Sequence, residues 1–269
     1  MREWIVGRNP VQETLRANRR EFFGLAAAEN LKEDQQIEAI FKLASARSIP
    51  VKRIPREQLD QYGSHHQSLA LQVGGYPYAD LDQVLKAAED REEPLFVLLL
   101  DVLKDPQNLG TLVRTAEAVG VHGVVLPYRR TATVTPAVVS ASSGACEHMR
   151  IVQANLAQTI SDLKEAGVWV YGLEGSSEAQ PPGDLDLSGP IAVVVGSEGE
   201  GMRRLVQESC DFLLALPMRG RIESLNASVA GSVALYLVWG ARGYSGSGTS
   251  GGTSGGTSGE TSGGNRPAG

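Results

Sequence analysis

The fold is decided by the stretch Leu95-Phe96-Val97-Leu98-Leu99-Leu100-Asp101, in which six apolar residues end at a carboxylate. A continuous apolar run of this length predicts a strand that is buried on both faces, as in a parallel sheet. Further strands of this kind are expected at Gly123–Leu126, Val168–Leu173 and Ile191–Val195, with helical runs between them at Leu109–Val119, Leu156–Ala166 and Met202–Glu208. Residues 95–244 are therefore predicted to form an α/β domain with a parallel sheet covered on both faces.

Residues 1–75 predict a second, smaller α/β domain. Helices are expected from Asn9-Pro10 to about Asn18 and over the spacing Ile37, Ile40, Phe41, Ala44. Strands are expected at Phe22–Ala28, Pro50–Ile54 and Leu69–Val73. The sequence Gly74-Gly75-Tyr76-Pro77 then interrupts the pattern, and residues 76–94 are predicted to be a linker and a leading helix.

The last 25 residues, 245–269, contain 10 Gly, 6 Ser and 4 Thr. None of them carries an apolar side chain large enough to offset the entropy lost on ordering, so this segment predicts a disordered tail.

Composition excludes several classes of protein. Two cysteines, Cys146 and Cys210, are too few for a disulfide framework and are not spaced as zinc ligands, so no metal site is expected. The N-terminus lacks the apolar core of a signal peptide. The uncharged stretch Ser224–Ala241 contains Asn226, Ser228 and Ser232, which favours a buried helix over a membrane span. We expect a soluble, cytoplasmic protein that has no membrane partner.

The formal net charge is −6, which at face value argues against a nucleic-acid partner. The charge is unevenly distributed, however. Residues 1–78 contain 11 Lys or Arg against 9 Asp or Glu, and residues 79–244 contain 13 against 21. Within the small domain, the run from 47 to 56 has four basic residues and no acid: Arg47, Lys52, Arg53 and Arg56. The run indicates either a solvated surface or a contact for a polyanion.

Three polar segments follow predicted strands, at the carboxyl ends where α/β proteins bind ligands. The first is Asp105-Pro106-Gln107-Asn108-Leu109-Gly110, which leads into a helix that carries Arg114. Asn108 is either a ligand-facing side chain or the N-cap of this helix. Arg114 lies among apolar residues, so it needs a partner, either a ligand or Glu117 in an ion pair.

The second segment is Gly196-Ser197-Glu198-Gly199-Glu200-Gly201. A dinucleotide fingerprint would need glycine at position 198, which is Glu, and two carboxylates would repel a pyrophosphate. A neutral or cationic ligand is favoured. The third segment runs from Leu216-Pro217-Met218 to Ser224-Leu225-Asn226 and enters a helix rich in small residues, for which Ser224 is a candidate N-cap.

The three segments together resemble the motifs of SpoU-type (TrmH-type) RNA ribose 2′-O-methyltransferases of the SPOUT superfamily, in order and in spacing. The opening Gly7-Arg8-Asn9-Pro10-Val11 resembles the start of that family's RNA-binding domain. The branch that methylates a guanosine of large-subunit ribosomal RNA is the most similar. Two features depart from that branch: Ser68 replaces its usual glycine, and the tail has no counterpart.

This resemblance implies a ribosomal-protein-like N-terminal domain, a C-terminal domain with a trefoil knot, and a homodimer. It implies S-adenosylmethionine as cofactor, with contacts at Gly196, Leu216, Leu225 and, on the adjoining loop, Gly172. It implies catalytic roles for Arg114, Asn108, Glu198, Ser224 and Asn226, and RNA as substrate. The basic residues Arg47, Lys52, Arg53 and Arg56 are then expected to bind RNA.

We expect Arg114 to bind a phosphate and stabilise the developing alkoxide, since a guanidinium stays protonated and is a poor base. Asn108 and Asn226 would orient the nucleotide, while Ser224 and Glu198 would hold Arg114 and the loops. Two alternatives stay open: methylation of a transfer-RNA guanosine, and a nonenzymatic RNA-binding protein with a degenerate methyltransferase domain. The misplaced glycines disfavour a nicotinamide-dependent oxidoreductase.

Overall fold

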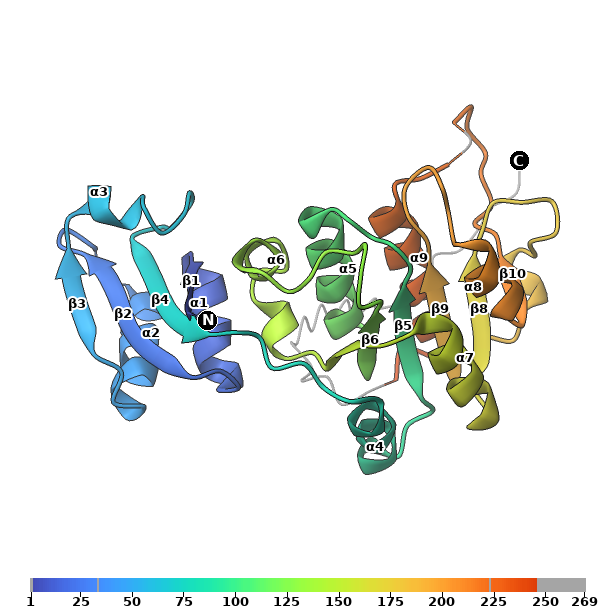
Figure 1. Cartoon of the computed structure of the whole chain (residues 1–269), viewed down its shortest axis with the longest axis horizontal. Coiled ribbons are helices and arrows are strands. Elements are labelled where there is room, and N and C mark those ends of the chain that lie inside the picture. Colours follow the sequence, from blue (N-terminus) through green and yellow to red (C-terminus); the bar gives the residue numbers. More distant parts are fainter. Residues whose placement is uncertain (1, 33, 223, 246–269) are drawn as a thin grey trace, which may run out of the picture.

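The computed structural model describes residues 2–32, 34–222 and 224–245, which form two sheets joined by a linker (Figure 1). The predicted disordered tail, 245–269, lies outside the described residues apart from Ser245. Within the described ranges, no helix has both the length and the apolar character needed to cross a membrane. The uncharged stretch near the C-terminus contains a helix of 15 residues.

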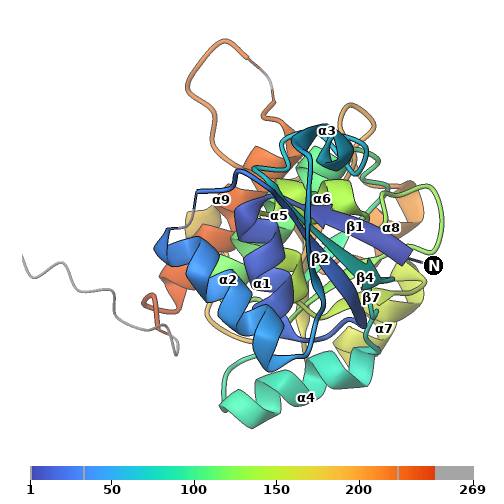
Figure 2. The same cartoon turned by 90° about the vertical axis from the view of Figure 1, so that its left-hand side faces the viewer.

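The first sheet has four strands in the order β1-β4-β2-β3. Its elements are β1 (Arg2–Val6), α1 (Arg8–Ala17), β2 (Phe22–Ala28), α2 (Gln35–Ala46), β3 (Val51–Ile54), α3 (Arg56–Leu59) and β4 (Leu69–Gly74). Strand β4 is antiparallel to β1 and β2, and β3 is parallel to β2 at the edge. Helices α1 and α2 lie side by side over one face (Figure 2). Strand β1 is not predicted from the sequence, because charged Arg2 and Glu3 open it and only Ile5 is fully buried.

The second sheet has six parallel strands in the order β10-β8-β9-β5-β6-β7. Its strands are β5 (Phe96–Leu100), β6 (Gly123–Leu126), β7 (Ile151–Gln153), β8 (Trp169–Leu173), β9 (Ile191–Val195) and β10 (Phe212–Leu214). Its helices are α4 (Leu81–Arg91), α5 (Pro106–Ala118), α6 (Pro136–Ala141), α7 (Leu156–Glu165), α8 (Arg204–Ser209) and α9 (Ala227–Ala241), with short 3-10 turns η1 (Ala145–Glu147) and η2 (Pro182–Asp184). Every residue of β5 and β9 is buried, which confirms the predicted α/β fold with a parallel sheet.

Two helix starts differ from the sequence expectation. Helix α5 begins at Pro106, where Asp105 accepts a hydrogen bond from the Gln107 amide, so the alternative that Asn108 is the N-cap is wrong. Helix α9 is capped by Asn226, whose Oδ1 accepts from the amides of Ser228 and Val229, and not by Ser224. In both cases the cap is the Asp or Asn next to the first helical residue.

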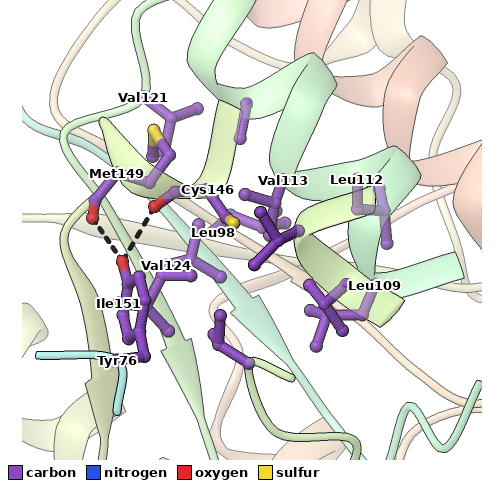
Figure 3. Close-up of a cluster of buried hydrophobic side chains, with 14 of the residues drawn as sticks. Tyr76, Leu98, Leu109, Leu112, Val113, Val121, Val124, Cys146, Met149 and Ile151 are labelled. Atoms are coloured by element: carbon purple, nitrogen blue, oxygen red, sulfur yellow. Dashed lines mark hydrogen bonds between the residues drawn. The ribbon is translucent and has the colours of Figure 1, made fainter. Parts of the chain in front are cut away.

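The linker is anchored in the core of the second domain. The Tyr76 ring is buried among apolar side chains from β5, α5 and β6 (Figure 3). Its hydroxyl lies 2.9 Å from the carbonyl oxygen of Cys146 and 2.7 Å from that of Met149. Burial raises the pKa of Tyr76, so the hydroxyl stays a neutral hydrogen-bond donor. The linker is therefore fixed to the second domain at its first residue, Tyr76.

A buried ion pair joins the two domains. The Arg20 guanidinium donates to both carboxylate oxygens of Glu147, at 3.0 Å and 2.7 Å, and also to Glu3 at 3.1 Å. Beside it, Arg19 donates to the carbonyl oxygens of Glu147, Met149 and Pro77. The side chains of Arg20 and Glu147 are 0% and 1% exposed. The basic cluster at the end of α1 therefore fixes the small domain against the large one.

His122 is a structural residue. Its Nδ1 accepts a hydrogen bond from the Phe96 amide at 3.0 Å, and its Nε2 faces Glu93 at 3.2 Å. An accepting Nδ1 requires the neutral ring. Burial, followed by the positive charge of Arg91, lowers the pKa of His122 below its ordinary 6.5.

We expect the free energy of unfolding to fall as the pH drops from about 6.5 towards the lowered pKa of folded His122. In that window the unfolded chain binds a proton that the folded chain excludes, at a cost of at most about 1.4 kcal/mol per pH unit. Urea unfolding at about pH 7.5 and about pH 5.5 checks this. In His122→Asn, the amide oxygen still accepts from Phe96 but does not titrate. An equal pH dependence in that variant would contradict the assignment.

Candidate active site

The candidate site lies where the loops after β5, β9 and β10 meet at the carboxyl edge of the second sheet. Glu198, in the loop after β9, accepts at Oε1 from Asn108 Nδ2 at 2.7 Å and also from Asn226 Nδ2. The Asn226 amide also donates to Asn108 Oδ1 at 3.3 Å. Three predicted residues, each from a different motif, thus form one hydrogen-bonded cluster, whose members are Asn108, Glu198 and Asn226.

The loop after β9 folds back on itself at Gly196. Ser197 and Gly201 exchange backbone hydrogen bonds of 2.9 Å and 3.1 Å, and Gly199 and Gly201 have φ of +81° and +66°. A Cβ at Gly196 would lie 2.3 Å from the backbone carbon of Gly201 and 2.4 Å from the Met202 nitrogen. Only glycine allows this close approach. Gly172 lies within strand β8 and not on a loop as expected, and a Cβ there would lie 2.7 Å from the Met202 methyl group.

The resemblance of the motifs implies that Gly196 contacts S-adenosylmethionine. On that assignment, we expect Gly196→Ala to weaken binding of this cofactor by about tenfold or more, because the new methyl group forces the backbone of the loop to move. Calorimetric titration of the cofactor measures the effect. Gly189→Ala is a matched control, since a Cβ at Gly189 meets nothing within 4 Å. Equal affinity in both variants would contradict the assignment of Gly196 to cofactor binding.

A buried carboxylate that holds this loop has no role in the sequence-based prediction. Asp101, the residue that ends the apolar run of β5, is 0% exposed. Its oxygens accept from the Arg203 amide at 2.7 Å and from Arg203 Nε at 2.8 Å. The next residue, Val102, has φ of +60°, which is strained for a β-branched side chain. Asp101 therefore ties the end of β5 to the loop that contains Glu198. The sequence feature that could identify Asp101 is a carboxylate directly after a buried strand.

Arg114 lies on α5 and is exposed. Its Nη1 donates to Ser143 Oγ at 3.1 Å, whereas the sequence-based hypothesis had Ser224 and Glu198 hold it. Ser143 precedes Gly144, where a Cβ would lie 2.7 Å from the Glu13 side chain of the small domain. Arg114 is therefore held by the same segment that contacts the first domain.

The segment between β10 and α9 rises above the sheet in both views (Figures 1 and 2). It carries Leu216, Ser224 and Leu225, of which Leu216 is half-buried and the other two are exposed. Its exposed apolar side chains include Met218 and Ile222, at 40% and 64% exposure. The structure does not bring Ser224 into the Asn108, Glu198 and Asn226 cluster.

Of the four basic residues predicted for RNA, three lie on or directly after the edge strand of the first sheet, and Arg47 caps the end of α2. Lys52 and Arg53 lie on edge strand β3, and Arg56 begins α3; all three are exposed. Arg47 is half-buried and donates to Asn18 and to the Leu43 carbonyl oxygen. Arg53 stacks over the Phe41 ring and donates to the Ala28 carbonyl oxygen.

A cavity of about 1060 Å³ lies at the opposite edge of the second sheet, where His122, Arg242 and Trp239 contribute to its lining. These residues precede or flank the amino ends of the strands. The cavity is therefore separate from the cluster at the carboxyl edge, and none of the predicted site residues lines it.

Both domains match known families. Residues 95–236 match the SpoU rRNA Methylase family, and residues 4–79 match the RNA 2′-O ribose methyltransferase substrate binding domain. YacO of Bacillus subtilis (strain 168), named as a TrmH family tRNA/rRNA methyltransferase, is 44% identical over 242 residues, which cover 89% of this chain and 96% of YacO. A protein of the same family from Staphylococcus aureus (strain COL) is 43% identical over 240 residues, which cover 88% and 96% of the two chains.

Solved structures show the same fold. The SpoU methyltransferase AviRb from Streptomyces viridochromogenes, in complex with AdoMet, gives a TM-score of 0.75 at 21% identity and covers 91% of this chain and 92% of its own. The AdoMet-bound rRNA methyltransferase from Sinorhizobium meliloti gives a TM-score of 0.72 at 22% identity. The match covers 88% of this chain and 87% of the Sinorhizobium protein. Family matches to both domains, relatives above 40% identity and the shared fold lead to one conclusion: this chain belongs to the SpoU/TrmH family of RNA methyltransferases.

Proposed function

We propose that this protein transfers a methyl group to the ribose 2′-hydroxyl of a guanosine in large-subunit ribosomal RNA. The observation that carries the proposal is the cluster of Asn108, Glu198 and Asn226, which joins three motifs at one edge of the sheet. The match of residues 4–79 to an RNA 2′-O ribose methyltransferase substrate-binding domain supports ribose as the acceptor.

The residues at the site fit S-adenosylmethionine better than a nucleoside phosphate. Glu198 and Glu200 lie in the turn that would approach the ligand, and carboxylates repel phosphate but not a sulfonium cation. Exposed Met218, Ile222 and Leu225 offer apolar surface for a nucleoside. We assign the cofactor contacts to Gly196, Leu216 and Leu225, with Gly172 behind the loop. When bound, the cofactor supplies a methyl group already activated by the positive sulfur.

Arg114 then acts on the acceptor. Among the described residues, the exposed Arg114 guanidinium makes one hydrogen bond, to Ser143, and so keeps donors for a phosphate oxygen and for the ribose oxygen. As the 2′-hydroxyl attacks, its proton leaves to the phosphate or to water, and Arg114 stabilises the negative charge that develops on the oxygen. Asn108 and Asn226 orient the nucleotide, and Glu198 holds both amides in place. Ser224 is assigned to loop closure around the substrate.

The quaternary structure proposed here is a homodimer. Helix α9 exposes three apolar side chains, Val229, Val233 and Tyr236, at 47%, 41% and 47%. Their spacing of four and three residues forms one stripe along the helix. A second copy of the chain would cover this stripe next to the site, and the mass of the protein in solution checks it.

The path of the chain supports a trefoil knot. After edge strand β10, the chain returns to pack α9 against α5 and β9, in the middle of the sheet, and so crosses the carboxyl ends of β8 and β9. We propose that this return threads the loop after β9.

The proposed domains are residues 1–75 for RNA binding, 76–94 as linker and leading helix, and 95–244 for methyl transfer. Two free cysteines suit a reducing cytoplasm.

The basic edge of the small domain is proposed to bind RNA. We expect the double variant Lys52→Ala with Arg56→Ala to weaken RNA binding. The slope of log K against log salt concentration should become shallower by about 1 to 2, because fewer counterions are released from the RNA when two phosphate contacts are missing. Lys52 and Arg56 are chosen because Arg47 and Arg53 also make contacts within the small domain, so that their loss would change its stability as well as its charge. Filter binding at several salt concentrations measures the slope.

The control for this pair is Lys86→Ala with Arg91→Ala, which removes two exposed charges from α4. Cofactor affinity should not change in either double variant. An RNA affinity that falls equally in both would show a general charge effect and contradict the assignment.

Purified protein, radiolabelled S-adenosylmethionine and protein-free RNA test the function itself. We expect label in large-subunit ribosomal RNA, on ribose, after digestion to nucleosides. Label in transfer RNA alone would favour the transfer-RNA alternative. Binding of RNA without cofactor binding would favour the nonenzymatic alternative.

A further inference from the structure

The loop after β6 exposes an aromatic ring beside two arginines. Tyr128 is 67% exposed, and Arg129 and Arg130 are exposed as well. In the described part of the chain, neither guanidinium has an ion pair or a hydrogen bond. Exposed aromatic rings stack on unpaired bases, and free guanidinium groups bind phosphates. The loop therefore offers both groups that hold single-stranded RNA.

A cavity of about 670 Å³ lies against this loop, lined by Val102, Lys104, Arg130, Thr131, Glu200 and Arg203. Its lining comes from the loops after β5, β6 and β9, three neighbouring strands at the carboxyl edge. Asp101 already neutralises Arg203, and Glu200 is the one acid of the six lining residues. Lys104 and Arg130 form no ion pair with the other residues that the structure describes, and the volume accommodates a nucleotide.

The loop is fixed next to the proposed active site. The Thr131 hydroxyl and the Ala132 amide both donate to the Leu103 carbonyl oxygen, at 2.9 Å and 2.7 Å. Leu103 lies in the segment that leads from β5 into the first turn of α5, which contains Asn108. The cavity also borders Glu200, two residues after Glu198. A nucleotide in it would lie beside the residues proposed to orient the target.

We propose that Tyr128, Arg129, Arg130 and Lys104 form a second RNA contact, on the catalytic domain, that holds a single-stranded nucleotide flanking the methylated ribose. The proposal rests on the proposed function. This contact would act together with the basic residues of the small domain. It would select an unpaired nucleotide, because the Tyr128 ring can stack only on a base that is not already stacked within an RNA double helix.

The test compares Tyr128→Ala, Tyr128→Phe and the double variant Arg129→Ala with Arg130→Ala. The probe is protein-free large-subunit ribosomal RNA from a strain that lacks the gene. We expect Tyr128→Ala to raise Kd and KM for this RNA by about tenfold, as for the loss of one stacked base, and Tyr128→Phe to restore both. The double Arg variant should reduce the salt slope by about 1.4, at about 0.7 for each single-strand phosphate contact.

Cofactor affinity and thermal unfolding should match the wild type in all three variants, and Lys86→Ala with Arg91→Ala should leave KM unchanged. A wild-type enzyme that methylates this RNA, with variants that keep its Kd, KM and salt slope, would overturn this inference alone. A wild-type enzyme that methylates no RNA would overturn the proposed function, and this inference with it.

Discussion

Arg114→Ala is expected to lose methyl transfer by a factor of about 10² to 10³, as when one donor to a developing oxyanion is removed. The Arg114 side chain is exposed on α5 and, within the part of the chain that the structure describes, has one hydrogen bond, to Ser143, so its loss removes no buried contact there. Thermal unfolding and calorimetric binding of S-adenosylmethionine should therefore match the wild type. Single-turnover methylation of RNA measures the loss directly.

Arg114→Lys separates charge from geometry. Lysine keeps the positive charge but lacks the planar fork that can bind a phosphate and the ribose oxygen together. We expect it to lose most of the activity as well. Near-normal turnover in Arg114→Ala with intact cofactor binding would show that Arg114 has no catalytic role.

Glu147→Ala is expected to destabilise the protein by about 3–5 kcal/mol, because it leaves the buried Arg20 charge without its bidentate partner. Burial by itself lowers the pKa of Arg20, but the hydrogen bond and charge of Glu147, with the charge of Glu3, raise it overall. The guanidinium thus stays charged and cannot escape the cost by losing its proton. Urea unfolding measures the change.

Two controls accompany this variant. Glu208→Ala breaks the exposed 3.7 Å pair with Arg204 and should leave stability unchanged. Arg20→Met with Glu147→Ala removes both charges and should recover much of the loss. A Glu147→Ala protein as stable as the Glu208→Ala protein would show that the ion pair does not hold the domains together.

The parts of the fold that the sequence predicts correctly are those with a local signal. The apolar runs at 95–100 and 191–195 lie in the two central strands, because burial on both faces requires every side chain to be apolar. Strands β7 and β10 have three residues each, too few to show a pattern. The Arg20 and Glu147 pair joins residues 127 positions apart, and no local signal reveals such a contact.

The motifs predict candidate site residues but not their geometry. The motifs name Asn108, Glu198 and Asn226, but only the structure shows that Glu198 accepts from both amides. Asp101 lacks a role in the sequence because its partner, Arg203, lies in another loop. Whole-chain charge does not point to the proposed RNA contact, since the exposed arginines at 129 and 130 lie within the acidic half of the chain.

The most direct test of the proposed activity maps ribose methylation in RNA from three strains. These carry the wild-type gene, a deletion, or the deletion complemented with Arg114→Ala. We predict a 2′-O-methylguanosine in large-subunit ribosomal RNA that is present in the first strain and absent from the other two. Identical ribose methylation in all three strains would contradict the central claim.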